Sequence, residues 1–185
     1  MPRTFTLDTN CIIAVAENQP AAWVVRTLAD AHAGRADVAV VAMSASEKQR
    51  GGHYLRNFAE FRDRLVSLGL GHLNVILPMG YWGISFWGQC LWPSDATKKL
   101  EHKIHLILFP AVQFLPPPNP PTGTWRNRNC DVQAIWSHIH HKRDVFVTSD
   151  CNFHKVDKKA ALIALGAGRI EHPEGALSLS PSHKS

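Results

Sequence analysis

Two short apolar segments, far apart in the chain, each lead to a carboxylate. Phe5, Thr6 and Leu7 run into Asp8, and residues 145–148 end two positions before Asp150. Both segments have the β-branched and aromatic composition of buried strands. In a parallel α/β sheet, ligands bind outside the carboxyl ends of the strands. We therefore predict that the two acids lie at such an edge.

Two further acids stand at the same kind of junction. Glu47 follows a strand predicted over 38–42, and Asp131 opens a helix predicted over about 131–142. A cluster of carboxylates repels itself unless a divalent cation holds it, and ligation by oxygen alone suits Mg²⁺ or Mn²⁺. The predicted catalytic and metal-binding acids are Asp8, Glu47, Asp131 and Asp150.

Each acid also has a purely structural explanation. Glu47 is the third residue after Ser44, as in a capping box. A helix dipole favours an acid at the start of a helix, which is the position predicted for Asp131. Asp8 and Asp150 suit turn or N-cap positions. These explanations put all four acids at junctions between a strand and a helix, where a site would also form.

The order of the predicted elements indicates the fold class. Strands and helices alternate, which is typical of an α/β fold, here a three-layer sandwich with a central parallel sheet. The predicted strands cover 4–8, 38–42, 144–148 and a short segment, followed by a turn, within 169–177. The predicted helices cover 20–33, 54–68, 94–109, 131–142 and 154–165, and further helices begin in the segments NCIIAVAEN and SASEKQRGG.

We expect a single domain over residues 1–177. A stretch from about 69 to 129 interrupts the alternation, since it is rich in tryptophan and contains the proline run PPPNPPTG, which can be neither helix nor central strand. This stretch is interpreted as an insertion packed on the core. Residues 178–185 are expected to form a flexible tail.

The composition favours a globular protein and is compatible with a phosphate-rich partner. The 185 residues are 45% hydrophobic and 19% charged, which excludes a disordered chain. No apolar run is long enough for a membrane helix, and the four cysteines contain no CxxC pair, so we expect a soluble, cytoplasmic protein without a membrane partner. The net charge of +5 is compatible with nucleic acid.

Four segments together resemble the signatures of PIN-domain ribonucleases. FTLDTNCII and VFVTSDCNF are similar to the family's first and last signatures. VAVVAMSASEKQRG and NRNCDVQAIWSHIHHKRDVFVTSD resemble the segments that bear its second, third and fourth acids. The resemblance covers roughly residues 4–66 and 129–177 and implies a PIN-like, Rossmann-like fold.

The resemblance also implies a function. It assigns a nuclease site to the same four acids, with Asn10 and Thr148 in support, and a Mg²⁺- or Mn²⁺-dependent hydrolysis of phosphodiester bonds, most often in single-stranded RNA. It raises the possibility of a toxin paired with an antitoxin, although the long insertion departs from compact members of the family. Glu47 is also open to a role as general base.

Basic and aromatic residues suggest partners. The candidates for phosphate contacts are Lys48, Arg50, Arg126 and Arg128, each of which is equally explained as solvated surface charge. The segment GYWGISFWGQCLWP is open to three uses: stacking on bases, packing on the core, or contact with a protein regulator or a second copy of the chain.

Histidine pairs and other functions have weaker support in the sequence. His138 and His141 share a helical face, as do Glu101 and His105, but neither pair has the further ligands of a zinc site, so surface or half-buried histidines are expected. A catalytically silent PIN-like binding module is the main alternative function. An aspartate phosphatase would need a second Asp where Asn10 stands, and no GxGxxG supports a dinucleotide enzyme.

Overall fold

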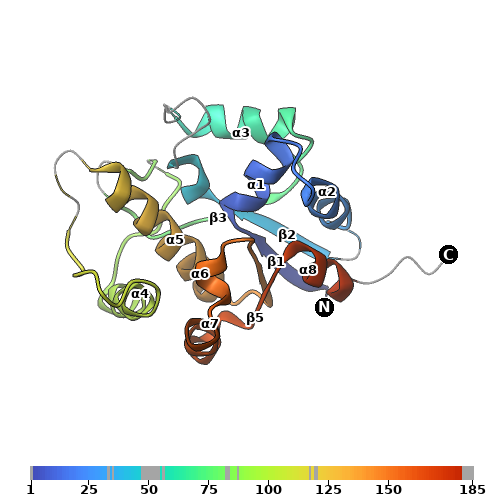
Figure 1. The fold of residues 1–185 in the computed structure, drawn as a ribbon. Helices are drawn as coiled ribbons and strands as arrows, with labels where there is room; N and C mark the ends of the chain where they lie inside the picture. The colour runs from blue at the N-terminus through green and yellow to red at the C-terminus, as the bar shows by residue number, and fades with distance from the viewer. Residues whose placement is uncertain are drawn as a thin grey trace.

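One parallel sheet of five strands organises the chain (Figure 1). The computed structural model describes residues 2–32, 34, 36–46, 55, 57–81, 84–86, 88–116, 118 and 121–180. The strand order is β3-β2-β1-β4-β5. The strands are β1 (Arg3–Leu7), β2 (Ala36–Val41), β3 (Asn74–Ile76), β4 (Val145–Val147) and β5 (Arg169–Glu171).

Helices flank both faces of this sheet, an arrangement compatible with a three-layer sandwich (Figure 1). The helices are α1 (Thr9–Ala16), α2 (Ala22–Asp30), α3 (Phe58–Ser67), α4 (Asp95–Leu108), α5 (Gly123–His140), α6 (Cys151–His154), α7 (Val156–Leu162) and α8 (Pro173–Leu179), with a 3-10 helix η1 (Ala42–Ser46) and a π-helical turn η2 (Ile163–Ala167). Within the described ranges, no helix is long and apolar enough to cross a membrane.

The strands are buried because helices cover both of their faces. Val145 and Val147 pack into the cluster that includes α1, α2, α3 and α8, whereas Phe146 between them packs into the cluster of α4, α5, α6 and α7. All three side chains are fully buried. Burying one such side chain stabilises the fold by roughly 1.5–3 kcal/mol. This two-sided burial explains why the strand segments are continuously apolar.

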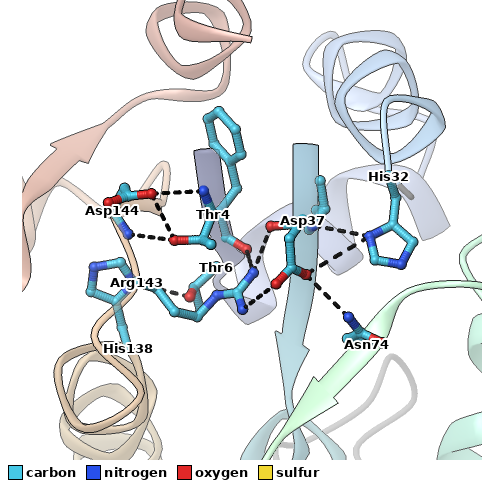
Figure 2. Close-up of polar contacts among 10 residues, drawn as sticks. Thr4, Thr6, His32, Asp37, Asn74, His138, Arg143 and Asp144 are labelled. Atoms are coloured by element: carbon cyan, nitrogen blue, oxygen red, sulfur yellow. Dashed lines mark hydrogen bonds and ion pairs between the residues drawn. The ribbon is translucent and has the colours of Figure 1, made fainter. Parts of the chain in front are cut away.

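A polar network joins the strands at their amino ends (Figure 2). The Arg143 guanidinium lies 3.1 Å from the Asp37 carboxylate and donates to the backbone carbonyls of Phe5 and Asp37 at 2.8 and 2.6 Å. The Asp144 carboxylate accepts from both the amide and the hydroxyl of Thr4. These contacts hold β1, β2 and β4 in register at the edge opposite to Asp8 and Asp150.

The predicted α/β class with a parallel sheet is confirmed. The helix predicted over 94–109 is present as α4, where the Ser94 side chain accepts from the Thr97 amide and a reciprocal bond completes a capping box. The helix predicted from 54 is α3, which begins after Asn57, since the Asn57 side chain accepts from the Glu60 amide at 2.9 Å.

Three boundaries differ from the prediction. Helix α5 begins at Gly123, well before the expected residue 131, and Thr122 caps it. The prediction missed this start because the polar run after Thr122 hides the periodicity of the helix. The helix predicted over 154–165 is interrupted at Lys155, whose extended backbone (φ −60°, ψ 129°) separates α6 from α7. The segment after the last strand was expected to form a turn but forms the helix α8, with Pro173 in the first helical turn.

Part of the expected insertion belongs to the sheet. Strand β3 lies within 69–129, yet it pairs in parallel with β2, and Ile76 packs under the sheet. The first turns of α5 also fall within that range. Three residues are too few to give a recognisable alternation, so β3 was not predicted.

Candidate active site

The strand order brings Asp8 and Asp150 to the ends of neighbouring strands. From β1 the chain proceeds through β2 to β3 on one side, whereas β4 and β5 lie on the other side of β1 (Figure 1). Strands β1 and β4 are therefore the neighbours between which the direction of winding reverses. In open α/β sheets, ligands bind outside the carboxyl ends of the strands at this position. Asp8 directly follows β1, and Asp150 follows β4.

Both acids cap the helix that follows them. The Asp8 Oδ1 atom accepts from the Thr9 amide at 2.8 Å at the start of α1. The Asp150 Oδ1 atom accepts from the Asn152 amide at 2.8 Å at the start of α6. The expected N-cap explanation is thus correct for both residues, but each carboxylate keeps a second oxygen that the cap does not use.

Thr148 links the two acids. Its hydroxyl donates to Asp8 Oδ2 at 2.7 Å and accepts from the Asp150 amide at 3.0 Å. The Asn10 side-chain amide lies 3.3 Å from the same Asp8 oxygen. Four of the residues predicted for the site, Asp8, Asn10, Thr148 and Asp150, are therefore brought together by contacts that span 140 positions in the sequence.

The environment of Asp8 disfavours its charge. Asp8 is 2% exposed. Burial, together with the negative charge of Asp150, raises its pKa to about 6 despite the hydrogen bonds from Thr148 and Thr9. A carboxyl whose pKa is shifted by burial and by a like charge is a common mark of a functional site. A cation between the two carboxylates would remove this penalty.

The structure changes the interpretation of Asp131. This residue is half-buried in the interior of α5, about two turns after the helix begins, so the helix dipole does not explain it as an opening residue. The neighbouring Cys130 packs with Val41 and Met43 at the carboxyl end of β2. The first half of α5 therefore lies beyond the same edge of the sheet as Asp8.

Three predicted residues, Glu47, Lys48 and Arg50, lie outside the described residues. The described chain before them ends in η1, which a hydrogen bond of 2.7 Å between the Thr9 and Ser44 hydroxyls ties to α1. The segment that leads to Glu47 thus starts next to Asp8. Neither Thr9 nor Ser44 was predicted to take part, because their contact depends on the pairing of β1 with β2.

The described donors fit a hard cation only in part. Asp8 and Asp150 provide carboxylate oxygens, which Mg²⁺ and Mn²⁺ prefer. Among the described residues, which include Asp8, Asp131 and Asp150, no group of three His, Cys, Asp or Glu side chains is arranged to hold a metal ion. The remaining predicted ligand, Glu47, lies outside the described residues.

Lys158 lies beside Asn152, next to the candidate site, and was not predicted from the sequence. Its ammonium donates to the side-chain oxygen of Asn152 at 2.6 Å and to the carbonyl of Leu108. Burial and the charge of Lys155 lower its pKa, whereas the charge of Asp150 raises it. The sequence offered no signal, since Lys158 lies in a basic helix that resembles a solvated surface.

His138 and two of the four cysteines lie in the interior of the protein. His138 is fully buried, whereas a surface or half-buried position was expected; its ring nitrogens contact the Thr6 hydroxyl at 2.9 Å and the Ala167 carbonyl at 2.8 Å. Cys11 and Cys130 are buried, whereas Cys151, next to Asp150, is exposed.

Comparison with known proteins gives no family. No protein-family model matches the chain, and no curated protein matches it. The resemblance to PIN-domain ribonucleases therefore depends on the residues of the chain alone.

Proposed function

We propose that the protein is a metal-dependent nuclease of the PIN-like kind, which hydrolyses phosphodiester bonds in single-stranded RNA. The observation that carries the proposal is the Asp8 and Asp150 pair, which follows the two adjacent strands of the switch point and is linked through Thr148. Glu47 and Asp131 would complete the acid set. The PIN-like identity of the fold is part of the same proposal.

The side chains have distinct tasks in this scheme. Thr148 and Asn10 hold the Asp8 carboxylate in one orientation by donating to its Oδ2 atom. The buried position of Asp8 strengthens its attraction to any cation, because a low dielectric screens charge weakly. A Mg²⁺ or Mn²⁺ ion bound by the acids would activate water and neutralise the charge that develops during phosphodiester hydrolysis. Lys158, near Asp150, would attract the substrate phosphate.

One alternative enzyme class fits the geometry less well. An aspartate phosphatase uses the strand-terminal carboxylate as a nucleophile, which must meet the substrate directly. This chemistry also needs a second Asp where Asn10 stands, and the Asn10 side chain instead donates to Asp8 Oδ2. A silent binding module remains the alternative outcome of the test below. An antitoxin or other regulator, a homodimer and a cytoplasmic location are further parts of the proposal.

The test is cleavage of labelled single-stranded RNA and DNA with Mg²⁺, Mn²⁺ or EDTA. Wild type is compared with Asp8→Asn and with Asp63→Asn, a matched change at an exposed acid of α3. We expect cleavage that requires metal, disappears in Asp8→Asn and persists in Asp63→Asn. In parallel, the melting temperature is measured with and without metal, since a bound cation stabilises the folded state. If neither cleavage nor stabilisation by metal occurs, the silent module is the better description.

A further inference from the structure

A second concave site lies between α4, α5 and the segment 112–115. Its pocket has a volume of about 90 Å³. Helices α4 and α5 lie side by side at this point (Figure 1). The side chains that matter for its chemistry are Tyr81, His105, Phe114, Trp125, Arg128 and Asn129.

Aromatic rings form the walls of this pocket. Tyr81 meets Trp125 edge to face, with ring centroids 5.7 Å apart. Phe114 packs against His105 with centroids 5.0 Å apart and keeps 36% of its surface exposed. The Tyr81 hydroxyl donates to the buried Glu101. The part of Tyr81 that is available to contact a ligand is therefore its ring. Such walls suit a planar ring, which stacks on aromatic faces.

Two residues that line the pocket each carry a buried polar atom without a hydrogen-bond partner among the described residues. Within the described part of the chain, His105 Nδ1 and Asn129 Nδ2 make no hydrogen bond, although the two residues are only 8% and 7% exposed. Buried polar atoms are almost always paired, so each unpaired one calls for an explanation such as a ligand. Burial, helped by the charge of Arg128, lowers the pKa of His105 and favours the neutral ring, which offers one donor and one acceptor.

Arg128 lines this pocket and lies one helical turn before Asp131. Its Nε atom donates to the Thr124 carbonyl at 3.3 Å, which anchors the guanidinium on α5. Asp131 lies three positions further along the same helix, so the two side chains are neighbours, with about 5–6 Å between their Cβ atoms. A ligand that extends from the pocket past Arg128 therefore approaches Asp131, one of the four proposed acids.

We propose that this pocket binds one nucleobase of a single-stranded nucleic acid, with the adjoining phosphate at Arg128. The inference depends on the proposed nuclease function for its biological substrate, but binding of a nucleotide is measurable without cleavage. A base has planar faces for the aromatic walls and polar edge atoms for His105 and Asn129. An apolar ligand would leave these two groups unpaired, and a simple anion would not use the walls.

The experiment is calorimetric titration of the protein in EDTA with the four nucleoside 5′-monophosphates and with ribose 5-phosphate, which lacks a base. Asn129→Asp replaces the unpaired donor by an acceptor of the same shape. Asn127→Asp, two residues earlier and exposed, is the matched control with the same change in charge. We expect at least one nucleotide to bind about tenfold more tightly than ribose 5-phosphate, and Asn129→Asp to weaken it about tenfold. Asn127→Asp should change the affinity less than about twofold.

A second variant protects the test against a folding defect in Asn129→Asp. Arg128→Gln, at a half-buried position, should weaken binding of the monophosphate but leave binding of the corresponding nucleoside unchanged. If no nucleotide binds more tightly than ribose 5-phosphate, or if Asn127→Asp acts as strongly as Asn129→Asp, the base pocket is wrong. RNA cleavage without nucleotide binding would also refute the pocket while preserving the nuclease. Nucleotide binding without any cleavage would preserve the pocket and refute the nuclease.

Discussion

Replacing Asp8 by Asn should stabilise the folded protein at neutral and alkaline pH in the absence of metal. Burial raises the pKa of Asp8 from 3.8 to about 6, so the folded state binds more protons than the unfolded chain between these values. The free energy of unfolding therefore falls as the pH rises through this window. The full shift corresponds to about 3 kcal/mol above pH 6. An uncharged Asn avoids this cost.

Part of the gain is lost with a hydrogen bond. The single carbonyl oxygen of Asn cannot accept from both the Thr9 amide and the Thr148 hydroxyl, as the two Asp8 oxygens do. One lost bond costs about 1 kcal/mol, so the net stabilisation near pH 8 is about 2 kcal/mol. Near pH 4, where Asp8 is protonated in the folded state, the same substitution should be neutral or slightly destabilising. The difference between the two pH values, about 2–3 kcal/mol, does not depend on the hydrogen-bond cost.

The assay is urea unfolding in EDTA at about pH 4 and about pH 8. Asp63→Asn, at an exposed position, is the control and should stay within about 0.5 kcal/mol of wild type at both values. If Asp8→Asn destabilises the protein equally at both pH values, the carboxyl is not held in a desolvated state and the electrostatic reasoning fails. A gain in stability together with a loss of cleavage would mark Asp8 as a residue kept for function.

Three further outcomes are expected. Arg143→Met should lower the free energy of unfolding in urea by about 3 kcal/mol, because the buried guanidinium joins Asp37 and two backbone carbonyls; a loss below about 0.5 kcal/mol would contradict this role. Burial lowers the pKa of His138 to about 4, so this residue by itself should contribute a loss of about 3 kcal/mol as the pH falls from 6.5 to 4. In urea unfolding at the two pH values, the stability of wild type relative to His138→Gln should therefore fall by about that amount, whatever the other titrating groups contribute. Iodoacetamide should modify the exposed Cys151 in the native protein but Cys11 only after unfolding, because burial raises the pKa of the Cys11 thiol. Labelling of Cys11 in the native protein, detected by mass spectrometry, would contradict this protection.

Local sequence patterns predicted the elements that carry strong signals. Continuous apolar runs identified β2 and β4, since strands covered on both faces need no polar side. The helix predicted over 94–109 is present as α4, and the structure shows that Ser94 caps it. The start of α5 and the short β3 were missed, because a polar helical turn and a strand of three residues carry too little periodicity.

The sequence by itself determined that acids follow apolar strands in a parallel α/β fold, because hydrophobic runs and turn residues are local properties of the chain. Only the tertiary structure decided that β1 and β4 are neighbours, and hence that the Thr148 hydroxyl forms hydrogen bonds with both Asp8 and Asp150. It also decided that Asp8 is buried and that His105 and Asn129 line one pocket. These properties depend on distances and dielectric surroundings, which packing between remote segments sets and which no local pattern contains.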